Sequence, residues 1–210
     1  SKFGVPRQSG LVPASLAVIE FEPEYRNPDA LRGLEGFSHI WLIWGFFENA
    51  EADWSPTVRP PRLGGNERMG VFATRSPFRP NGLGLSAVKL ERVDAESPAG
   101  PLLHVSGADL MDGTPIYDIK PYVPYADAIK SAACGFAAEP ERERLRVEIP
   151  EELAAKIPAD KLPALLQSLA LDPRPAYQDD PQRVYGVSFA GLNIRFTVDG
   201  CVLLIVGVND

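Results

Sequence analysis

The residues best able to do chemistry gather in one stretch, from Arg59 to Lys120. Between Arg59 and Lys89 there are five arginines and one lysine against a single acid, Glu67, although the whole chain has a net charge of −7. Arginine stays charged at any biological pH, and its planar fork matches the geometry of phosphate. This stretch, which is also rich in proline and glycine, therefore favours binding of a polyanion. Alternatively, the arginines only scaffold a long surface loop.

The second half of this stretch, residues 107–122, carries the opposite charge. It contains three aspartates, two tyrosines and one lysine, separated by turn residues. Two loops of opposite charge are expected around a site that binds a cation and a polyanion together. The individual aspartates could instead be turn caps, a role in which aspartate is common.

Length and composition limit the class of protein. A chain of 210 residues, 45% of them hydrophobic, makes one large domain or a core domain with a small appendage. No apolar run reaches the ~18–20 residues of a membrane helix, and the sequence opens without a signal peptide. Cys134 and Cys201 lack C-x-x-C spacing and only two histidines accompany them, so zinc is not expected. We predict a reduced, cytoplasmic, metal-free protein with no membrane partner.

Hydrophobic alternation predicts short strands over most of residues 1–127. A short helix should begin after Asn27, with Asn27 as its cap and Pro28 at its first position. The aromatic run 37–47 reads as a central strand buried on both faces, with His39 as a hydrogen-bonded core histidine. The other predicted strands are residues 16–21, 69–74, 85–93, 102–106, 116–119 and 122–125. This pattern favours a small, mainly antiparallel barrel or sandwich.

The composition changes after Asp127. Residues 128–140 are predicted to be a linker, and residues 141–210 a small α+β domain. Leucines at i, i+3, i+4 and i+7 predict an amphipathic helix over 162–169 that is closed by Asp172-Pro173. Strands are expected at 145–149, 183–189, 192–198 and 202–208, with a two-residue hairpin turn at 198–201.

The common nucleotide-binding and hydrolase motifs are absent. Gly82-x-Gly84 lacks the third glycine of a dinucleotide fingerprint, and the residues that follow it are strand-like instead of helical. The sequence has no P-loop and no Gly-x-Ser-x-Gly elbow. The absence of these motifs does not exclude a ligand pocket of an unusual kind.

Several long blocks resemble the TrmO (TsaA-like) family. They are Lys2-Phe3-x-x-Pro6-Arg7-Gln8, Phe37-Ser38-His39, residues 56–66, residues 70–75, Phe78-Arg79-Pro80-Asn81, Asp112-Gly113-Thr114-Pro115, residues 118–122 and residues 172–177. The resemblance runs through nearly the whole chain. It implies a β-barrel, homodimeric, S-adenosylmethionine-dependent methyltransferase. The substrate implied is the exocyclic N6 amine of threonylcarbamoyl-adenosine at tRNA position 37.

The resemblance also implies a set of cofactor-binding residues. They are Pro6, Arg7, Gln8, Phe47, Glu48, Arg75, Leu85, Asp109, Leu110, Asp112, Gly113, Thr114 and Pro115. This sequence departs from the family at three places. The family has a strand ahead of the Lys-Phe block, whereas this chain starts without one. Gly82-Leu83 follow Asn81 where proline and isoleucine or leucine are usual. Phe47 stands where many members have histidine, so no side-chain hydrogen bond to the cofactor is expected there.

The chemistry of methyl transfer agrees with these residue types. A methylsulfonium donor is a cation that needs nearby oxygens, and its carboxylate needs donors; Asp109, Asp112, Gln8 and Arg75 fit those needs. Most of the rate should come from positioning. A threonylcarbamoylated amine is urea-like and more acidic, so a carboxylate base is plausible. The candidate catalytic residues are Asp118, Asp112, Asn81 and Tyr117.

Cations interleaved with aromatic residues predict where tRNA binds. An arginine between two prolines, followed by a tyrosine, pairs a phosphate-binding group with a stacking face. Alternatively, this segment only connects two elements. The predicted nucleic-acid-binding residues are Arg59, Arg62, Arg68, Arg79, Lys120, Arg174, Tyr177, Arg183, Tyr185 and Arg195. We expect the tail domain to bind the anticodon arm. The rival interpretation is a non-catalytic RNA- or nucleotide-binding barrel.

Overall fold

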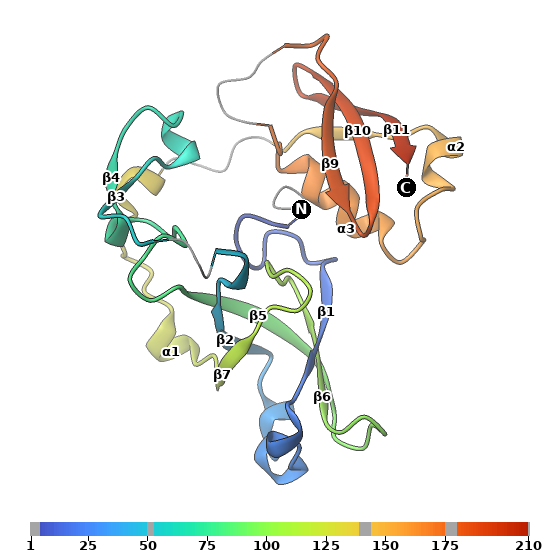
Figure 1. Ribbon diagram of the computed structural model, residues 1–210. Coiled ribbons are helices and arrows are strands. Elements are labelled where there is room, and N and C mark those ends of the chain that lie inside the picture. The colour runs from blue at the N-terminus through green and yellow to red at the C-terminus, as the bar shows by residue number, and fades with distance from the viewer. Residues whose placement is uncertain (1–4, 50–52, 139–143, 175–179, 210) are drawn as a thin grey trace. The chain divides into compact units, whose positions relative to one another are not determined.

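The computed structural model describes residues 5–49, 53–138, 144–174 and 180–209 (Figure 1). The chain divides into two compact units. The N-terminal unit consists of Arg7–Pro56 and Arg75–Ala132. The C-terminal unit consists of Ser1–Pro6, Thr57–Thr74 and Ala133–Asp210.

The N-terminal unit is built on a five-stranded antiparallel sheet in the order β1-β6-β5-β2-β7 (Figure 1). Its strands are β1 (Leu16–Glu20), β2 (His39–Gly45), β5 (Leu83–Asp94), β6 (Leu102–Ser106) and β7 (Ile116–Pro121). Alternate residues of these strands, such as Ile40, Leu42, Val88 and Leu103, are almost fully buried on one face. The predicted strands at 16–21, 85–93, 102–106 and 116–119 are thereby confirmed.

Short helices connect these strands. They are η1 (Pro23–Tyr25), η2 (Pro28–Leu31), η3 (Leu34–Gly36), η4 (Phe47–Asn49) and α1 (Pro124–Asp127). The predicted start after Asn27 is confirmed, because the Asn27 side chain accepts a hydrogen bond from the Asp29 amide at 3.0 Å. Pro28 then supplies a backbone already set for a helical turn.

The prediction that residues 37–47 are buried on both faces is wrong. Ile40 and Leu42 point into the core, whereas Trp41 and Ile43 on the other face of β2 are only half-buried. His39 is exposed, and its Nδ1 contacts the Ser38 hydroxyl at 2.9 Å, so it is not a core histidine. An aromatic run cannot by itself distinguish a two-sided core from one covered face.

One other predicted strand is replaced by a helical turn, and a second is confirmed only at its first two residues. Residues 122–125 are not a strand, because α1 begins at Pro124 and the Asp127 carboxylate accepts from the Val123 amide at 2.8 Å. Only Met69–Gly70 (β4) of the predicted strand 69–74 is extended, and it pairs with Thr57–Val58 (β3). A 3-10 helix, η6 (Val71–Ala73), follows it.

The C-terminal unit contains a four-stranded sheet in the order β8-β11-β10-β9 (Figure 1). Its elements are β8 (Arg146–Glu148), α2 (Glu151–Ala154), α3 (Leu162–Ala170), β9 (Tyr185–Phe189), β10 (Leu192–Asp199) and β11 (Val202–Asn209). β8 joins in parallel and the other pairs are antiparallel. Leu165 and Leu169 of α3 pack against the inner side chains of the sheet, which confirms the predicted helix. Also in this unit are β3, β4, η5 (Pro61–Leu63), η6 and η7 (Gly135–Ala137).

The β10–β11 hairpin turn differs by one residue from its prediction. Asp199 pairs with Val202, so the two turn residues are Gly200 and Cys201. Gly200 has φ 54, a conformation that glycine adopts without strain. Asp199 instead extends β10 by one residue.

The predicted barrel is not confirmed. Within residues 5–49 and 53–138 the sheet is open, with β1 and β7 as its edges, and no closed barrel is found. The fold is mainly β, with antiparallel sheets and a small helical content. No helix in the described part of the chain is long and apolar enough to cross a membrane.

Candidate active site

A chain of hydrogen bonds lies at one end of the N-terminal sheet. The Trp44 indole Nε1 donates to the Ser86 Oγ at 2.9 Å, and the Ser86 hydroxyl donates to the Asp109 Oδ1 at 2.6 Å. Ser86 is 1% exposed, on the inner face of β5. The ring of Trp44 lies over Gly84, where an added Cβ would come within 2.2 Å of an indole carbon. The glycine therefore makes room for the indole that holds the serine.

Asp109 is half-buried, and its carboxyl is surrounded by donors. Burial raises the pKa of this carboxyl, while Ser86, its own amide, the Ser9 amide and the Arg75 charge act in the opposite direction. Arg75 also donates from its guanidinium to the Gln8 side-chain oxygen. The fold thus brings together three predicted cofactor-binding residues that lie far apart in the sequence. We call Gln8, Arg75 and Asp109 the Asp109 cluster.

Backbone contacts fix the loop that carries Asp109. The Gly10 amide donates to the Gly107 carbonyl at 2.8 Å, and the Gly107 amide donates to the Ser15 carbonyl at 2.9 Å. Ser15 also donates from its hydroxyl to the Ala108 carbonyl at 3.0 Å. Gly107 has φ 76, and an added Cβ would meet the Gly10 backbone at 3.2 Å. The N-terminal loop with Arg7 and Gln8 is consequently held beside the β6–β7 loop.

The remainder of the β6–β7 loop forms a tight turn. The Thr114 hydroxyl donates to the Met111 carbonyl at 2.6 Å, and Gly113 has φ 76. Asp112 is exposed on this turn, and Leu110 is half-buried. The Pro115 carbonyl accepts from the Gly45 amide at 3.0 Å, which joins the end of the loop to β2.

Tyr117 occupies a β-bulge in β7. Ile43 pairs with Asp118 and Trp44 with Ile116, so Tyr117 is the extra residue between them. A bulge turns a side chain out of the regular alternation. The Tyr117 hydroxyl lies against Gly45, where an added Cβ would be 2.7 Å from it. No sequence pattern around Tyr117 indicated this bulge.

Asp118 lies outside the Asp109 cluster as far as the described contacts show. It is exposed on β7 and pairs with Lys120 at 3.2 Å, while its Oδ1 accepts from the Ile119 amide at 2.9 Å. The Lys120 hydrogen bond and the amide lower the pKa of Asp118. A carboxylate held in this way is a weaker base.

The remaining predicted residues near this end of the sheet are mostly exposed. Asn81 is exposed in the turn before β5, and its carbonyl accepts from the Leu83 amide at 2.7 Å. Phe47 is 38% and Leu85 56% exposed, and Glu48 is exposed in η4. Pro6, half-buried, belongs to the C-terminal unit, whereas Arg7 belongs to the N-terminal one.

The loop arginines divide between the two units. Arg59 and Arg68 are exposed in the C-terminal unit, where Arg68 donates to the Thr57 hydroxyl at 2.9 Å. Arg62 lies in η5 of the same unit. Arg79 is half-buried in the N-terminal unit and donates to the Ser76 carbonyl at 3.3 Å. The prediction that these side chains bind phosphate is not tested by these contacts.

Two of the predicted RNA-binding residues in the tail are buried. Arg174 is 8% exposed and forms a bidentate ion pair with Asp172, with Nε–Oδ1 at 2.9 Å and Nη2–Oδ2 at 3.0 Å. Tyr185 is also 8% exposed and stacks on Phe196 at 5.6 Å. Neither is available to RNA, so both assignments are corrected to structural roles.

The other three tail residues have different surroundings. Arg183 is exposed, with its guanidinium carbon 5.5 Å from the Tyr185 ring centre. Arg195 is exposed on β10. Tyr177 lies outside the described residues.

Sequence reasoning missed Ser86, Trp44 and Ser9. One signal for Ser86 was available. In the strand predicted at 85–93, Ser86 falls on the same face as Val88 and Leu90, so it is a polar residue in an apolar register. Such a residue needs a buried hydrogen-bond partner.

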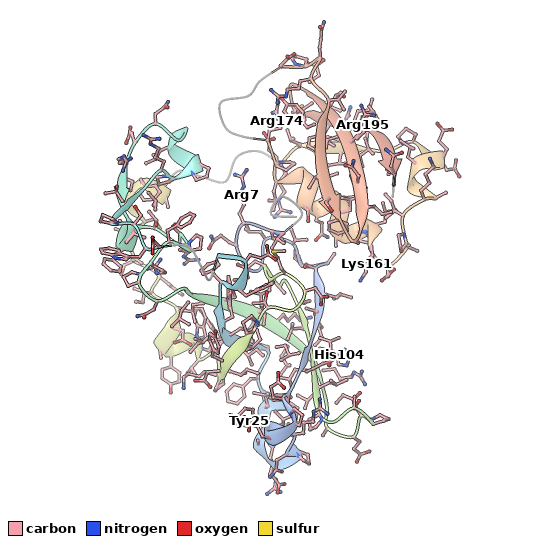
Figure 2. All side chains as sticks on the ribbon, in the orientation of Figure 1. Arg7, Tyr25, His104, Lys161, Arg174 and Arg195 are labelled. Atoms are coloured by element: carbon pink, nitrogen blue, oxygen red, sulfur yellow. The ribbon has the colours of Figure 1, made fainter. Side chains whose placement is uncertain are left out.

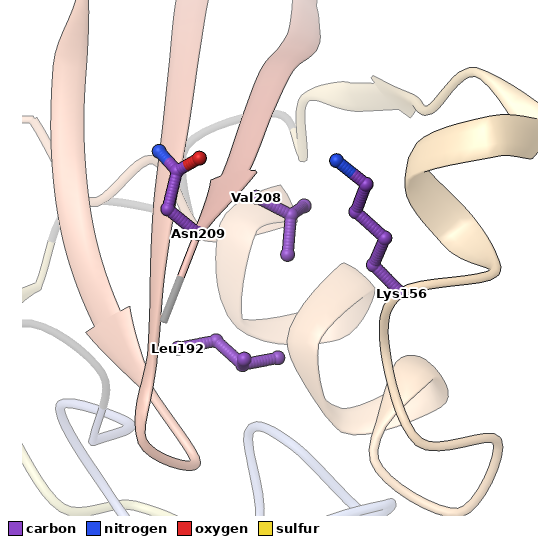
Figure 3. A pocket seen from close by; sticks show the side chains of 4 residues that line it. All are labelled: Lys156, Leu192, Val208 and Asn209. Atoms are coloured by element: carbon purple, nitrogen blue, oxygen red, sulfur yellow. The ribbon is translucent and has the colours of Figure 1, made fainter.

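A cavity of about 590 Å³ in the C-terminal unit is lined by Lys156, Leu192, Val208 and Asn209 (Figure 3). It contains none of the predicted site residues. Among the described residues its lining has one cation, Lys156, which gives no indication of a specific ligand, so we do not assign the cavity to the active site.

The donor set of the Asp109 cluster fits S-adenosylmethionine. This cofactor carries cationic sulfonium and ammonium groups, a carboxylate and an adenosine. The carboxylate of Asp109 matches a cationic group, and the guanidinium of Arg75 and the amide of Gln8 match anionic and polar groups. The rings of Trp44 and Phe46, 4.4 Å apart at their centres, add an apolar edge.

Comparison with known proteins agrees with this chemistry. Residues 1–128 match the tRNA-methyltransferase O N-terminal domain, and residues 142–210 match the TrmO C-terminal domain. A tRNA (adenine(37)-N6)-methyltransferase from Eikenella corrodens is 53% identical over 82% of this chain and 97% of its own length. A relative from Pseudomonas aeruginosa, whose name describes an S-adenosylmethionine-dependent methyltransferase, is 44% identical over 93% of this chain and 85% of its own.

The solved structures give the same result. A crystal structure of TrmO from Pseudomonas aeruginosa superimposes with a TM-score of 0.79 at 37% identity, covering 100% of this chain and 91% of that one. Both halves of the sequence and the overall fold therefore match one family. The chain belongs to the tRNA-methyltransferase O family and is an enzyme of that class.

Proposed function

We propose that the protein transfers a methyl group from S-adenosylmethionine to the N6 amine of adenosine 37 in tRNA, and that this adenosine carries a threonylcarbamoyl group. The observation that carries the proposal is the Asp109 cluster, whose carboxylate, guanidinium and amide suit the charged ends of the donor. The names of the relatives support the reaction and the methyl donor. The threonylcarbamoyl group comes from the family resemblance.

Each residue of the cluster has a separate task. S-adenosylmethionine, when bound, supplies an electrophilic methyl group. Asp109 attracts its positive charge, and Ser86 and Trp44 hold the Asp109 carboxylate in one orientation. Arg75 and Gln8 donate to the anionic and hydroxyl groups of the donor. Because the displacement is in line, this positioning supplies most of the rate.

The proton of the N6 amine needs an acceptor. Asp118 is the weaker candidate, because Lys120 engages its carboxylate and lowers its pKa. Asp112 is exposed on the same loop as Asp109, and Tyr117 is turned towards Gly45 at the end of β2. We propose that Asp112 accepts the proton and that Tyr117 and Asn81 help to orient the amine.

We propose that exposed arginines of the C-terminal unit bind the phosphates of the anticodon arm. Arg59, Arg68, Arg183 and Arg195 are all exposed there. Replacing any one of them with alanine should reduce the dependence of tRNA affinity on salt by roughly one unit of log–log slope.

A homodimer is the assembly that we propose. Leu16, Val18 and Leu85 are 66%, 50% and 56% exposed on the outer face of the N-terminal sheet, and a second copy would cover such apolar side chains. We also propose that the free edges of β1 and β7 are closed into a barrel in the assembled enzyme, since open edges invite wrong pairing.

The test combines binding with product analysis. Titration calorimetry with S-adenosylmethionine should show binding, and nucleosides from tRNA incubated with enzyme and donor should show threonylcarbamoyl-adenosine heavier by one CH₂ group. Binding without that gain in mass would favour the rival function, a non-catalytic nucleotide- or RNA-binding protein. A gain on plain adenosine 37 would remove the threonylcarbamoyl requirement.

A further inference from the structure

Arg195 stands between two glycines on the open face of the C-terminal sheet. It pairs with Gly186 of β9 on one side and with Gly207 of β11 on the other. Ile194 and Phe196, its neighbours along β10, are buried in the core, so Arg195 projects from the opposite, exposed face (Figure 2). We call Gly186, Arg195 and Gly207 the glycine strip.

Neither glycine is required by the local backbone. Neither has a positive φ. An added Cβ at Gly186 would meet only the Asn193 Oδ1 at 3.6 Å, and one at Gly207 would meet the Arg195 Cβ at 3.5 Å, which are ordinary contacts. Glycine inside a strand weakens it, and it often marks a place where a ligand or another backbone approaches closely.

A nearby bulge does not explain Gly207. The β10–β11 register shifts between Arg195 and Phe196, which leaves Val206 as the extra residue. The bulge form that requires glycine places it in the left-handed region, and Gly207 is not there. Gly186 and Gly207 therefore lower the stability of their strands, and no contact in the described part of the fold requires glycine at either position.

The strip has the chemistry of a nucleotide-binding surface. The Arg195 guanidinium makes no hydrogen bond or ion pair with any residue that the structure describes. Its stem lies along Gly207, within 3.9 Å of the position of an added Cβ. The side chains of Leu204 and Val206 are 39% and 44% exposed beside it. The planar Arg195 guanidinium lies beside two residues without side chains and is flanked by apolar groups. A nucleotide base could stack on such a surface, and its phosphate could pair with the guanidinium.

We propose that the glycine strip binds one nucleotide of a single-stranded tRNA loop, which lies flat on the sheet with its base or phosphate against Arg195. The proposal rests on the proposed tRNA methyltransferase function. It adds a recognition surface formed by the sheet face, in place of the buried Arg174 and Tyr185. Because the two glycines have no side chains, nothing at their positions blocks the approach of the nucleotide to the guanidinium.

Two added side chains test the strip. Gly186→Thr and Gly207→Ala place groups on the strip in strand positions that tolerate them. We expect an unchanged or raised unfolding midpoint, unchanged S-adenosylmethionine affinity, and a roughly tenfold loss of affinity for a transcribed tRNA, comparable to losing one stacked base. Ser188→Thr, two residues along β9, is the matched control and should bind tRNA as the wild type does.

Arg195→Gln separates charge from shape. This exposed substitution should leave folding intact and reduce the salt slope of tRNA binding by roughly one. Wild-type tRNA affinity and salt slope in all three variants would overturn the proposal. So would an altered oligomeric state with unchanged tRNA affinity, because the face would then be a protein interface. Failure of the wild type itself to methylate tRNA that carries threonylcarbamoyl-adenosine at position 37 would instead refute the proposed function.

Discussion

Replacing Ser86 with alanine tests how the Asp109 cluster is organised. The change removes the one hydroxyl that accepts from Trp44 at 2.9 Å and donates to Asp109 at 2.6 Å. Leaving a buried donor unpaired costs about 1–3 kcal/mol, and losing a hydrogen bond to a charged group costs about 1.5–3 kcal/mol. Because Trp44 and Asp109 are only half-buried, water replaces part of both contacts. We expect a loss of about 2–3 kcal/mol in the free energy of unfolding.

The same substitution should change the dependence of stability on pH. Burial raises the pKa of Asp109 in the folded state, and the Ser86 hydrogen bond partly offsets this rise. A group with a raised folded pKa contributes stability at low pH and loses it as the pH rises through the folded pKa. In Ser86→Ala that pKa rises further. The stability gap to the wild type should therefore be widest near neutral pH and should narrow in acid.

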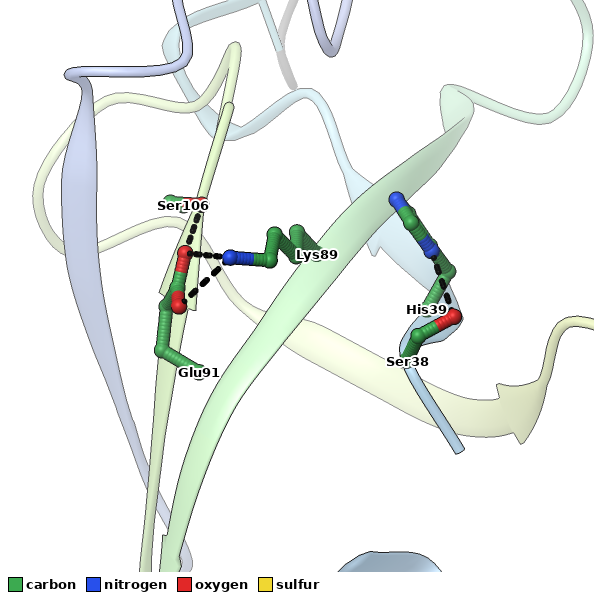
Figure 4. Close-up of polar contacts among 5 residues, drawn as sticks. All are labelled: Ser38, His39, Lys89, Glu91 and Ser106. Carbon is green, nitrogen blue, oxygen red and sulfur yellow. Dashed lines mark hydrogen bonds and ion pairs between the residues drawn. The ribbon is translucent and has the colours of Figure 1, made fainter. Parts of the chain in front are cut away.

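The assay pairs urea unfolding, measured from about pH 4 to pH 7.5, with calorimetry of S-adenosylmethionine. Affinity should fall on the order of tenfold, equivalent to about 1.4 kcal/mol. Ser106→Ala is the matched control for cofactor affinity, which it should leave unchanged, because this serine is also buried and donates to a carboxylate, Glu91, at 2.5 Å on the same sheet (Figure 4). Its hydrogen bond lowers the pKa of Glu91, so this control should also give a stability gap that narrows in acid. A constant stability gap across this pH range, with unchanged cofactor affinity, would refute the role given to Ser86.

Three further substitutions separate site residues from structural ones. Arg75→Ala should weaken S-adenosylmethionine binding by about 1.5–3 kcal/mol, the value of a charged hydrogen bond, and an unchanged Kd in calorimetry would exclude Arg75 from the site. Arg174→Met should destabilise the C-terminal unit by about 3–5 kcal/mol, because it removes the guanidinium partner of the buried Asp172 carboxylate. Guanidinium chloride unfolding measures this, and a loss below about 1 kcal/mol would show that the ion pair is dispensable. Asp118→Asn should leave methylation within about twofold, since Lys120 already engages that carboxylate; a hundredfold fall in kcat would make it the base.

The sequence predicted regular elements well where periodicity was strong. The apolar residues alternate in 85–93, as in a strand, and the structure has β5 there. The leucines in 162–169 have helical spacing, and the structure has α3 there. Prediction failed where a local contact decided the backbone. Asp127 capping the Val123 amide produced α1 in place of a strand.

The candidate site was predictable in its residues but not in its connections. Family motifs indicated Gln8, Arg75 and Asp109, and the structure brings them together. The register of Ser86 showed that it needs a buried partner, but that partner, Asp109, is 23 residues away and only the fold makes them neighbours. Arg174 was predicted to bind RNA because the sequence shows a cation between two prolines. Only the structure shows that its guanidinium is buried against Asp172.

The central claim is that the Asp109 cluster holds the methyl donor. A crystal structure of the enzyme with S-adenosylmethionine, supported by the same crystal form without it, tests this claim most directly. We predict density for the donor in contact with the Asp109 carboxylate, and hydrogen bonds from Arg75 and Gln8 to its polar groups. Donor density elsewhere in the chain, with Asp109, Arg75 and Gln8 free of contact, would contradict the account.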